Sequence, residues 1–141
     1  MAYQEVVFTS ASEVGKLKGR TDTIVISICD PGSDKAPIQD GFKDVLYLAF
    51  DNVDGRSGKG VAISEAQANE ILAFLDKHEA AADRILVNCV SGESRSAGVA
   101  FYMALKYNLE IEDDELGFMN HWVVHVLEKA DARRQSQAVA L

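Results

Sequence analysis

The feature that most constrains this 141-residue chain is the run over residues 85–96, which reads Ile-Leu-Val-Asn-Cys-Val-Ser-Gly-Glu-Ser-Arg-Ser. An apolar segment ends at Cys89, small residues follow, and an amphipathic segment begins at Arg95. This pattern predicts a β-strand, a tight loop and the first turn of a helix. Such a loop directs successive backbone N–H groups and a positive helix end into one small space, where a phosphoryl dianion fits.

Two side chains in this run carry the expected chemistry. The thiol of Cys89 would lie at the bottom of the loop, where N–H donors stabilise the thiolate and lower its pKa from about 8.5 toward roughly 3.5–7.5. The planar guanidinium of Arg95 can bind two phosphoryl oxygens at once. Together they suit phosphoryl transfer through cysteine. The residues expected to bind phosphate through the loop are Val90, Ser91, Gly92, Glu93, Ser94 and Arg95.

Strand-like and helix-like segments alternate along the chain. Strands are expected near 5–8, 23–28, 45–50 and 85–88. Helices are expected near 10–18, 64–78, 95–107 and 113–130, the second of them opened by a capping box from Ser64 to Gln67. This order predicts an α/β fold with a central, mostly parallel sheet of four or five strands flanked by helices. Cys89 stands at the carboxyl end of a strand, where such sheets bind ligands.

The composition limits the domain organisation and the classes of partner. The sequence predicts a single domain over residues 1–131 and a frayed tail over 132–141. A net charge of −8 without a basic run argues against nucleic acid and anionic membranes as partners. The first ten residues lack the pattern of a signal peptide. Two cysteines suit a reducing compartment, so we expect a cytoplasmic protein; its oligomeric state stays open.

The run Cys89-x5-Arg95-Ser96, with Gly92 inside it, resembles the signature loop of the cysteine-dependent protein tyrosine phosphatase superfamily. Its ending, Gly-Glu-Ser-Arg-Ser, is most similar to the dual-specificity branch, of small bacterial or phage type. The segment Tyr47-Leu48-Ala49-Phe50, the aspartates after it and the helix from Ser64 follow in the family's order. The resemblance therefore covers residues 24–107.

This resemblance implies a phosphoric monoester hydrolase that acts through a cysteinyl-phosphate, on phosphotyrosine and also on phosphoserine or phosphothreonine. Ser96 would hydrogen-bond the sulfur of Cys89 and help it leave. An aspartate would protonate the leaving oxygen: the family alignment places Asp54 at that position, and Asp51 is the alternative. No metal or other cofactor is implied. The expected partner is a phosphorylated protein or a small phosphomonoester.

Two residues depart from the family's pattern. Asn88 stands where the family has a histidine before the cysteine, and it predicts a less acidic thiol because it brings no positive charge. Glu93 stands where many members have an apolar or aromatic side chain, and we expect it to point outward. The second hypothesis is therefore a phosphate-recognising binding module with weak or no catalysis. A sulfurtransferase or an arsenate-reducing thiol enzyme is a third.

Three other patterns carry weaker signals. Cys29 ends a strand and is expected in the core, with a role as resolving thiol for oxidised Cys89 as the alternative. The glycines of residues 55–60 fail the spacing of a nucleotide-binding loop. His121 and His125 stand four apart, but no third ligand follows the metalloprotease pattern, so surface or packing roles are expected.

Overall fold

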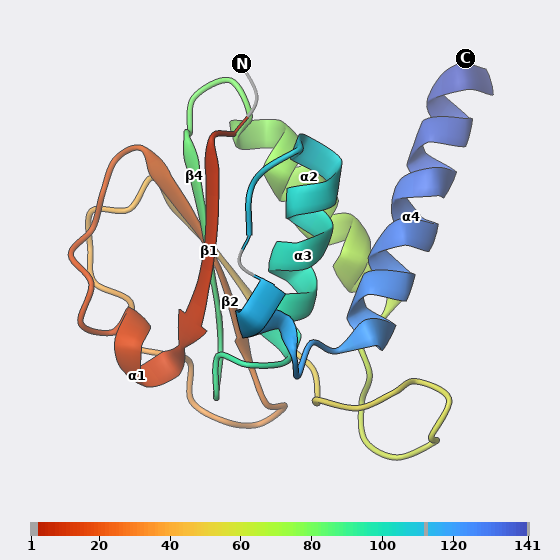
Figure 1. Ribbon diagram of the computed structural model, residues 1–141, viewed down its shortest axis with the longest axis horizontal. Coiled ribbons are helices and arrows are strands. Elements are labelled where there is room, and N and C mark those ends of the chain that lie inside the picture. The colour runs from red at the N-terminus through yellow and green to blue at the C-terminus, as the bar shows by residue number, and fades with distance from the viewer. Residues whose placement is uncertain (1–2, 112, 141) are drawn as a thin grey trace.

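The computed structural model describes residues 3–111 and 113–140 (Figure 1). Its strands are β1 (Glu5–Ser10), β2 (Thr23–Cys29), β3 (Asp44–Ala49) and β4 (Arg84–Cys89). Its helices are α1 (Ala11–Val14), α2 (Glu65–His78), α3 (Arg95–Tyr107) and α4 (His121–Ala140), with a 3-10 turn, η1 (Asp113–Leu116). Within these residues the four strands form one sheet in the order β1-β4-β2-β3, and every pairing is parallel. The predicted α/β fold with a largely parallel sheet is confirmed.

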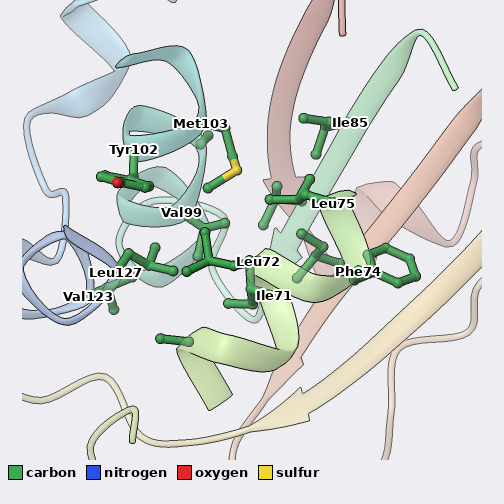
Figure 2. Close-up of a cluster of buried hydrophobic side chains, with 14 of the residues drawn as sticks. Ile71, Leu72, Phe74, Leu75, Ile85, Val99, Tyr102, Met103, Val123 and Leu127 are labelled. Carbon is green, nitrogen blue, oxygen red and sulfur yellow. The ribbon is translucent and has the colours of Figure 1, made fainter. Parts of the chain in front are cut away.

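Both faces of the sheet are covered, which explains why β2 is a nearly continuous apolar run. Ile24, Ile26 and Ile28 of β2 belong to the main core, which α2, α3 and α4 complete (Figure 2). Val25 of β2 points to the opposite face and joins a smaller cluster with Val14 of α1. Helices α2, α3 and α4 cover one face of the sheet, and α1 with the segment after β2 covers the other. Because the strands are parallel, their carboxyl ends lie together at one edge of the sheet, next to the loops that follow them.

Helix α2 begins where the sequence predicts, with a capping box. The Ser64 hydroxyl accepts a bond from the Gln67 N–H at 3.1 Å, and the Gln67 side chain accepts one from the Ser64 N–H at 3.0 Å. The Gln67 amide also donates to the carbonyl of Ala49 at 2.9 Å. This contact ties the start of α2 to the end of β3, so both ends of the loop between them are fixed.

Helix α1 is much shorter than the predicted helix over 10–18. Ser10 caps it as expected, but it ends at Val14, its buried residue. Beyond it, Lys16 and Leu17 donate their N–H groups three residues back, to Glu13 and Val14. This segment turns instead of extending the helix, because Leu17 is left exposed and no apolar stripe continues past Val14.

The predicted helix over 113–130 is wrong at both ends. The acidic run forms only the short turn η1, and α4 starts at His121 because the Asn120 side chain accepts a bond from the Val123 N–H at 3.1 Å. Helix α4 then continues to Ala140, so the frayed tail predicted from residue 132 is helical and the boundary drawn at 131 falls inside the helix. Arg133 and Arg134 pair with acidic residues of α2, which holds this part of α4 against the domain. Residue 141 lies outside the described residues.

Across the described ranges, no helix has both the length and the apolar character that crossing a bilayer requires.

Candidate active site

The Cys89–Arg95 loop joins the end of β4 to the start of α3. The N–H of Ala11 donates to the carbonyl of Val90 at 3.2 Å, so the loop rests on the end of β1. Gly92 has a φ of +78°, and a Cβ on it would lie 2.5 Å from the backbone nitrogen of Ser10. Glycine is therefore required at this position, both for the left-handed backbone and for the close approach to β1.

Cys89 is 1% exposed, and its environment favours the thiolate. Its Sγ lies 3.1 Å from Oγ of Ser96 and accepts a bond from the N–H of Gly92 at 3.3 Å. Burial acts to raise the thiol pKa, but hydrogen bonds from the Ser96 hydroxyl and from the N–H groups of Ser96, Gly92 and Ser94 outweigh it. The pKa of Cys89 therefore lies below its ordinary value.

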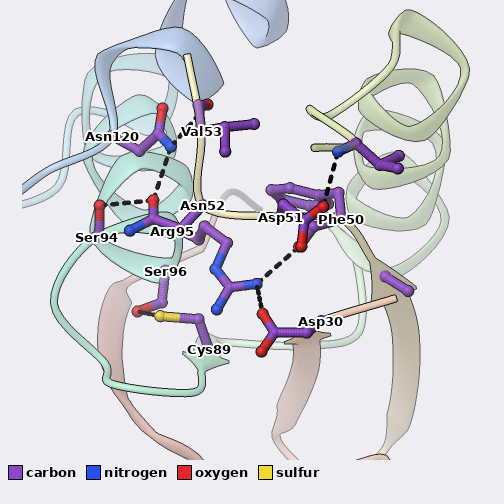
Figure 3. A network of polar contacts seen from close by, with 12 residues as sticks. Asp30, Phe50, Asp51, Asn52, Val53, Cys89, Ser94, Arg95, Ser96 and Asn120 are labelled. Carbon is purple, nitrogen blue, oxygen red and sulfur yellow. Dashed lines mark hydrogen bonds and ion pairs between the residues drawn. The ribbon is translucent and has the colours of Figure 1, made fainter. Parts of the chain in front are cut away.

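The guanidinium of Arg95 is buried and bound on one side by the protein (Figure 3). Its Nη1 donates to Oδ1 of Asp30 at 2.8 Å and to the carbonyl of Phe50 at 2.7 Å. Its Nε is buried without a hydrogen-bond partner among the residues that the structure describes. A buried cationic N–H donor that lacks a partner is a group that an oxyanion can satisfy.

Asp30 is a site residue that the sequence does not predict. It begins a turn, in which the Ser33 N–H donates to the Asp30 carbonyl at 3.1 Å. The signal that could have found the residue is topological. Asp30 follows β2, which pairs with β4 in parallel, so it lies at the same sheet edge as Cys89.

The two candidate acids on the loop after β3 have different surroundings. Asp51 closes the base of the loop: its Oδ2 accepts the N–H of Val61 at 2.7 Å, and its own N–H donates to the Val61 carbonyl at 2.6 Å. The side chain of Asp54 is 58% exposed and accepts the N–H of Arg56 at 2.8 Å. Asp51 therefore holds the loop together, whereas the Asp54 side chain is exposed beside Arg56, whose Nε lies 3.7 Å from Oδ1 of Asp54.

Two asparagines that the sequence reading did not single out tie this loop to the Cys89–Arg95 loop (Figure 3). Oδ1 of Asn52 accepts bonds from the Ser94 hydroxyl and from the Asn120 amide, each at 2.9 Å. The same amide donates to the carbonyl of Val53 at 3.3 Å, and the N–H of Asn120 donates to the carbonyl of Ser94 at 3.0 Å. These bonds fix the segment before Asp54 relative to the start of α3.

No protein-family model and no curated protein sequence matches this chain. Among solved structures, it resembles the crystal structure of the human tyrosine phosphatase-like serine/threonine/tyrosine-interacting protein. The match has a TM-score of 0.53 and 18% sequence identity, and it covers 80% of this chain and 78% of that chain. The fold is phosphatase-like. At this identity the likeness concerns the fold, and the chemistry rests on the side chains described above.

The two residues that depart from the family's pattern lie in opposite environments of this phosphatase-like fold. Glu93 is exposed, as expected, so its carboxylate does not occupy the buried site. Asn88 is fully buried, between Thr9 of β1 and Ser27 of β2 in the sheet register. In the described ranges, neither its side-chain oxygen nor its nitrogen has a hydrogen-bond partner. The Asn88 side chain therefore makes no hydrogen bond to the Cys89–Arg95 loop within the described residues.

Three of the weaker sequence signals are also placed. Cys29 ends β2 but is partly exposed, so its predicted core position is wrong; its register partner Ala49 is exposed at the same open edge. The 55–60 loop packs on α4, since a Cβ on Gly55 would lie 2.2 Å from Cε2 of Trp122. The His125 ring lies against the Trp122 ring, with centroids 5.1 Å apart and the planes tilted by 42°. The described residues contain no group of three His, Cys, Asp or Glu side chains that could hold a metal.

Proposed function

We propose that this protein is a phosphomonoester hydrolase of the dual-specificity type that acts through a cysteinyl-phosphate on Cys89. The observation that carries the proposal is the combination of a buried thiol with a lowered pKa and a buried guanidinium whose Nε has no partner in the described part of the chain. A thiolate supplies the nucleophile, and the guanidinium with the loop N–H groups supplies the compensating charge for a phosphoryl group.

In the first step, the Cys89 thiolate attacks phosphorus, so the S–P bond forms while the bond to the leaving oxygen breaks. The loop N–H groups and Nε of Arg95 bind the equatorial oxygens, whose negative charge they balance. The leaving oxygen must gain a proton to depart as an alcohol or phenol. Asp54 supplies it, because its carboxyl group is exposed on a loop that Asn52 fixes to the start of α3.

In the second step, water attacks the phosphorus of the cysteinyl-phosphate, and the S–P bond breaks. The carboxylate of Asp54, now deprotonated, takes a proton from that water. The sulfur leaves as a thiolate, which the Ser96 hydroxyl stabilises from its position 3.1 Å away. Inorganic phosphate is released, and the site returns to its starting protonation.

The proposed substrates are phosphotyrosine and, as further substrates, phosphoserine and phosphothreonine, presented on a protein or as a small phosphomonoester. Arg56 and Lys59 lie on the same exposed loop as Asp54, so this loop carries positive charge that suits a phosphorylated substrate. Both cysteines are free thiols, which suits the reducing cytoplasm that we propose as its compartment. A panel of phosphopeptides that differ only in the phosphorylated residue would rank these substrates by kcat/KM.

A phosphate-binding module without turnover is the second candidate. It is favoured by Asn88, which offers the loop no charge and whose side chain has no hydrogen-bond partner within the described ranges. It is also favoured by the solved neighbour, which is named as a phosphatase-like interacting protein. On this alternative, the site recognises a phosphorylated partner but leaves the phosphoester intact.

One experiment separates the two candidates. Hydrolysis of p-nitrophenyl phosphate is measured with a metal chelator present, for the wild type and for Cys89→Ser, with vanadate as inhibitor. The phosphatase proposal predicts turnover that vanadate inhibits and that Cys89→Ser abolishes, while the variant still binds phosphopeptide. Phosphopeptide binding by the wild type with no turnover above Cys89→Ser would instead establish the binding module.

A further inference from the structure

A groove of about 1220 Å³ lies away from the candidate active site, along strand β1. Figure 1 shows the chain that follows α3 running between β1 and α3. Residues of β1, of α3 and of the segment 108–111 line the groove, and residues of the Cys89–Arg95 loop do not. The groove therefore belongs to an outer edge of the sheet.

Strand β1 offers unpaired backbone along this groove. It is the terminal strand of the sheet and pairs with β4 on its inner side. In the part of the chain that the structure describes, no strand pairs with its outer side. Alternate residues of a strand direct their N–H and C=O groups to opposite sides, so part of the six-residue strand presents these groups outward. Such an edge can accept a further strand from another chain.

Several side chains that line the groove are large, apolar and incompletely covered. Leu105 of α3, which lines the groove, is 60% exposed. Phe8 of β1, Phe101 of α3, and Leu109 and Ile111 after α3 are half-buried around it. These side chains provide an apolar surface for the residues of an extended segment that point toward α3, because alternate side chains of a strand share a face.

The charged side chains of the groove are all acidic. Glu5, Glu110 and Glu115 line it, and no lysine or arginine is among the described residues of its lining. Arg84 binds Glu5 at 2.9 Å, whereas no ion pair engages Glu110 or Glu115 within residues 3–111 and 113–140. This charge favours a basic occupant. It disfavours a second copy of the chain, because self-association would bring two acidic grooves together.

We propose that this groove binds an extended segment of a partner protein, in which basic and apolar residues alternate, by adding that segment as a strand beside β1. The apolar side chains of the segment contact Leu105 and its neighbours, and its lysines or arginines lie in the negative potential that Glu110 and Glu115 give the groove. This binding depends on the fold and the groove alone and is independent of the proposed catalysis. Cys89→Ser retains this binding.

The test uses the wild-type protein and fluorescence anisotropy with a labelled nine-residue peptide of alternating valine and lysine. A peptide of alternating valine and glutamate is the charge control. Two further valine–lysine peptides are N-methylated, one at odd and one at even positions. Strand addition uses only one edge of the peptide, so one methylated peptide binds at least about tenfold more weakly and the other binds like the parent.

The matched protein variants are Glu110→Lys/Glu115→Lys in the groove and Glu70→Lys/Glu128→Lys on exposed positions of α2 and α4. Both change the net charge by the same amount, and circular dichroism checks that both fold. The groove variant binds the basic peptide roughly tenfold more weakly, and the control binds it like the wild type. Equal weakening in both variants, or equal binding of both methylated peptides, overturns the proposal. So does a dimer, measured by sedimentation, that the groove variant dissociates.

Discussion

Replacing Asp30 by asparagine tests how the guanidinium of Arg95 is held in place. The carboxylate of Asp30 accepts a charged hydrogen bond from Nη1 at 2.8 Å, and the Arg95 side chain is only 6% exposed. Asparagine keeps the size and one oxygen acceptor but removes the charge. We expect Arg95 to lose part of its orientation, because the Phe50 carbonyl at 2.7 Å would remain as its other protein acceptor.

The magnitude follows from the exposure of the two partners. A hydrogen bond to a charged group contributes roughly 1.5–3 kcal/mol. The Asp30 side chain is 48% exposed, so solvent screens the interaction and we expect about 1–1.5 kcal/mol. If this energy is lost from the stabilisation of the transition state, kcat/KM falls about tenfold. Removing a negative charge beside the site also favours anion binding, so the fall should appear in kcat while the binding of inorganic phosphate, a ground-state ligand, is retained or strengthened.

The assay is steady-state hydrolysis of an aryl phosphate, with urea unfolding measured in parallel. Asp34→Asn is the matched control, because Asp34 is exposed on the same segment and takes part in no side-chain bond in the described chain. Asp30→Glu should recover part of kcat. If kcat/KM of Asp30→Asn stays within twofold of the wild type, while Arg95→Ala abolishes activity, the carboxylate does not position the guanidinium.

Three further predictions concern the loop and the acid. Ser96→Ala should raise the Cys89 pKa, because the Ser96 hydroxyl helps to hold it below its ordinary value. The acidic limb of the pH–rate profile, where activity falls as the thiolate is protonated, should then move to higher pH, and an unchanged limb contradicts this. Asp54→Asn should lower kcat about 10²–10⁴-fold for poor leaving groups and much less for p-nitrophenyl phosphate. Asp51→Asn should mainly make the loop more susceptible to proteolysis, and equal effects of both variants on kcat would contradict the assignment of Asp54 as the general acid. Gly92→Ala should abolish activity and lower the melting temperature, because its φ of +78° and the 2.5 Å approach to β1 leave no room for a Cβ; wild-type activity would contradict this geometry.

The parts of the structure that the sequence predicts are those specified by neighbouring residues. The strand, loop and helix around Cys89 follow from an apolar run, small residues and an amphipathic segment. The capping box at Ser64 is likewise specified within four residues. The alternation of strands and helices predicts a parallel sheet, because parallel strands need crossover connections.

The parts that the sequence does not predict depend on which strands become neighbours. Asp30 and Arg95 are 65 residues apart, and they meet because β2 lies between β4 and β3, an order that no local pattern specifies. Asn52 and Asn120 are 68 residues apart, and they meet because α4 packs against α2 and α3, which no local pattern specifies either. The start of α4 was misplaced because the acidic residues before it resemble a helix start, while the cap comes from Asn120.

The most direct test of the proposed catalysis is mass spectrometry of the intact protein, quenched in acid during turnover of an aryl phosphate. We predict a fraction of the wild-type protein that carries one added phosphoryl group, assigned to Cys89 by peptide mapping. The adduct should accumulate in Ser96→Ala, because the sulfur leaves more slowly without the hydroxyl 3.1 Å away, and it should be absent from Cys89→Ser. Turnover without an adduct on Cys89, or an adduct on another residue, would contradict the mechanism.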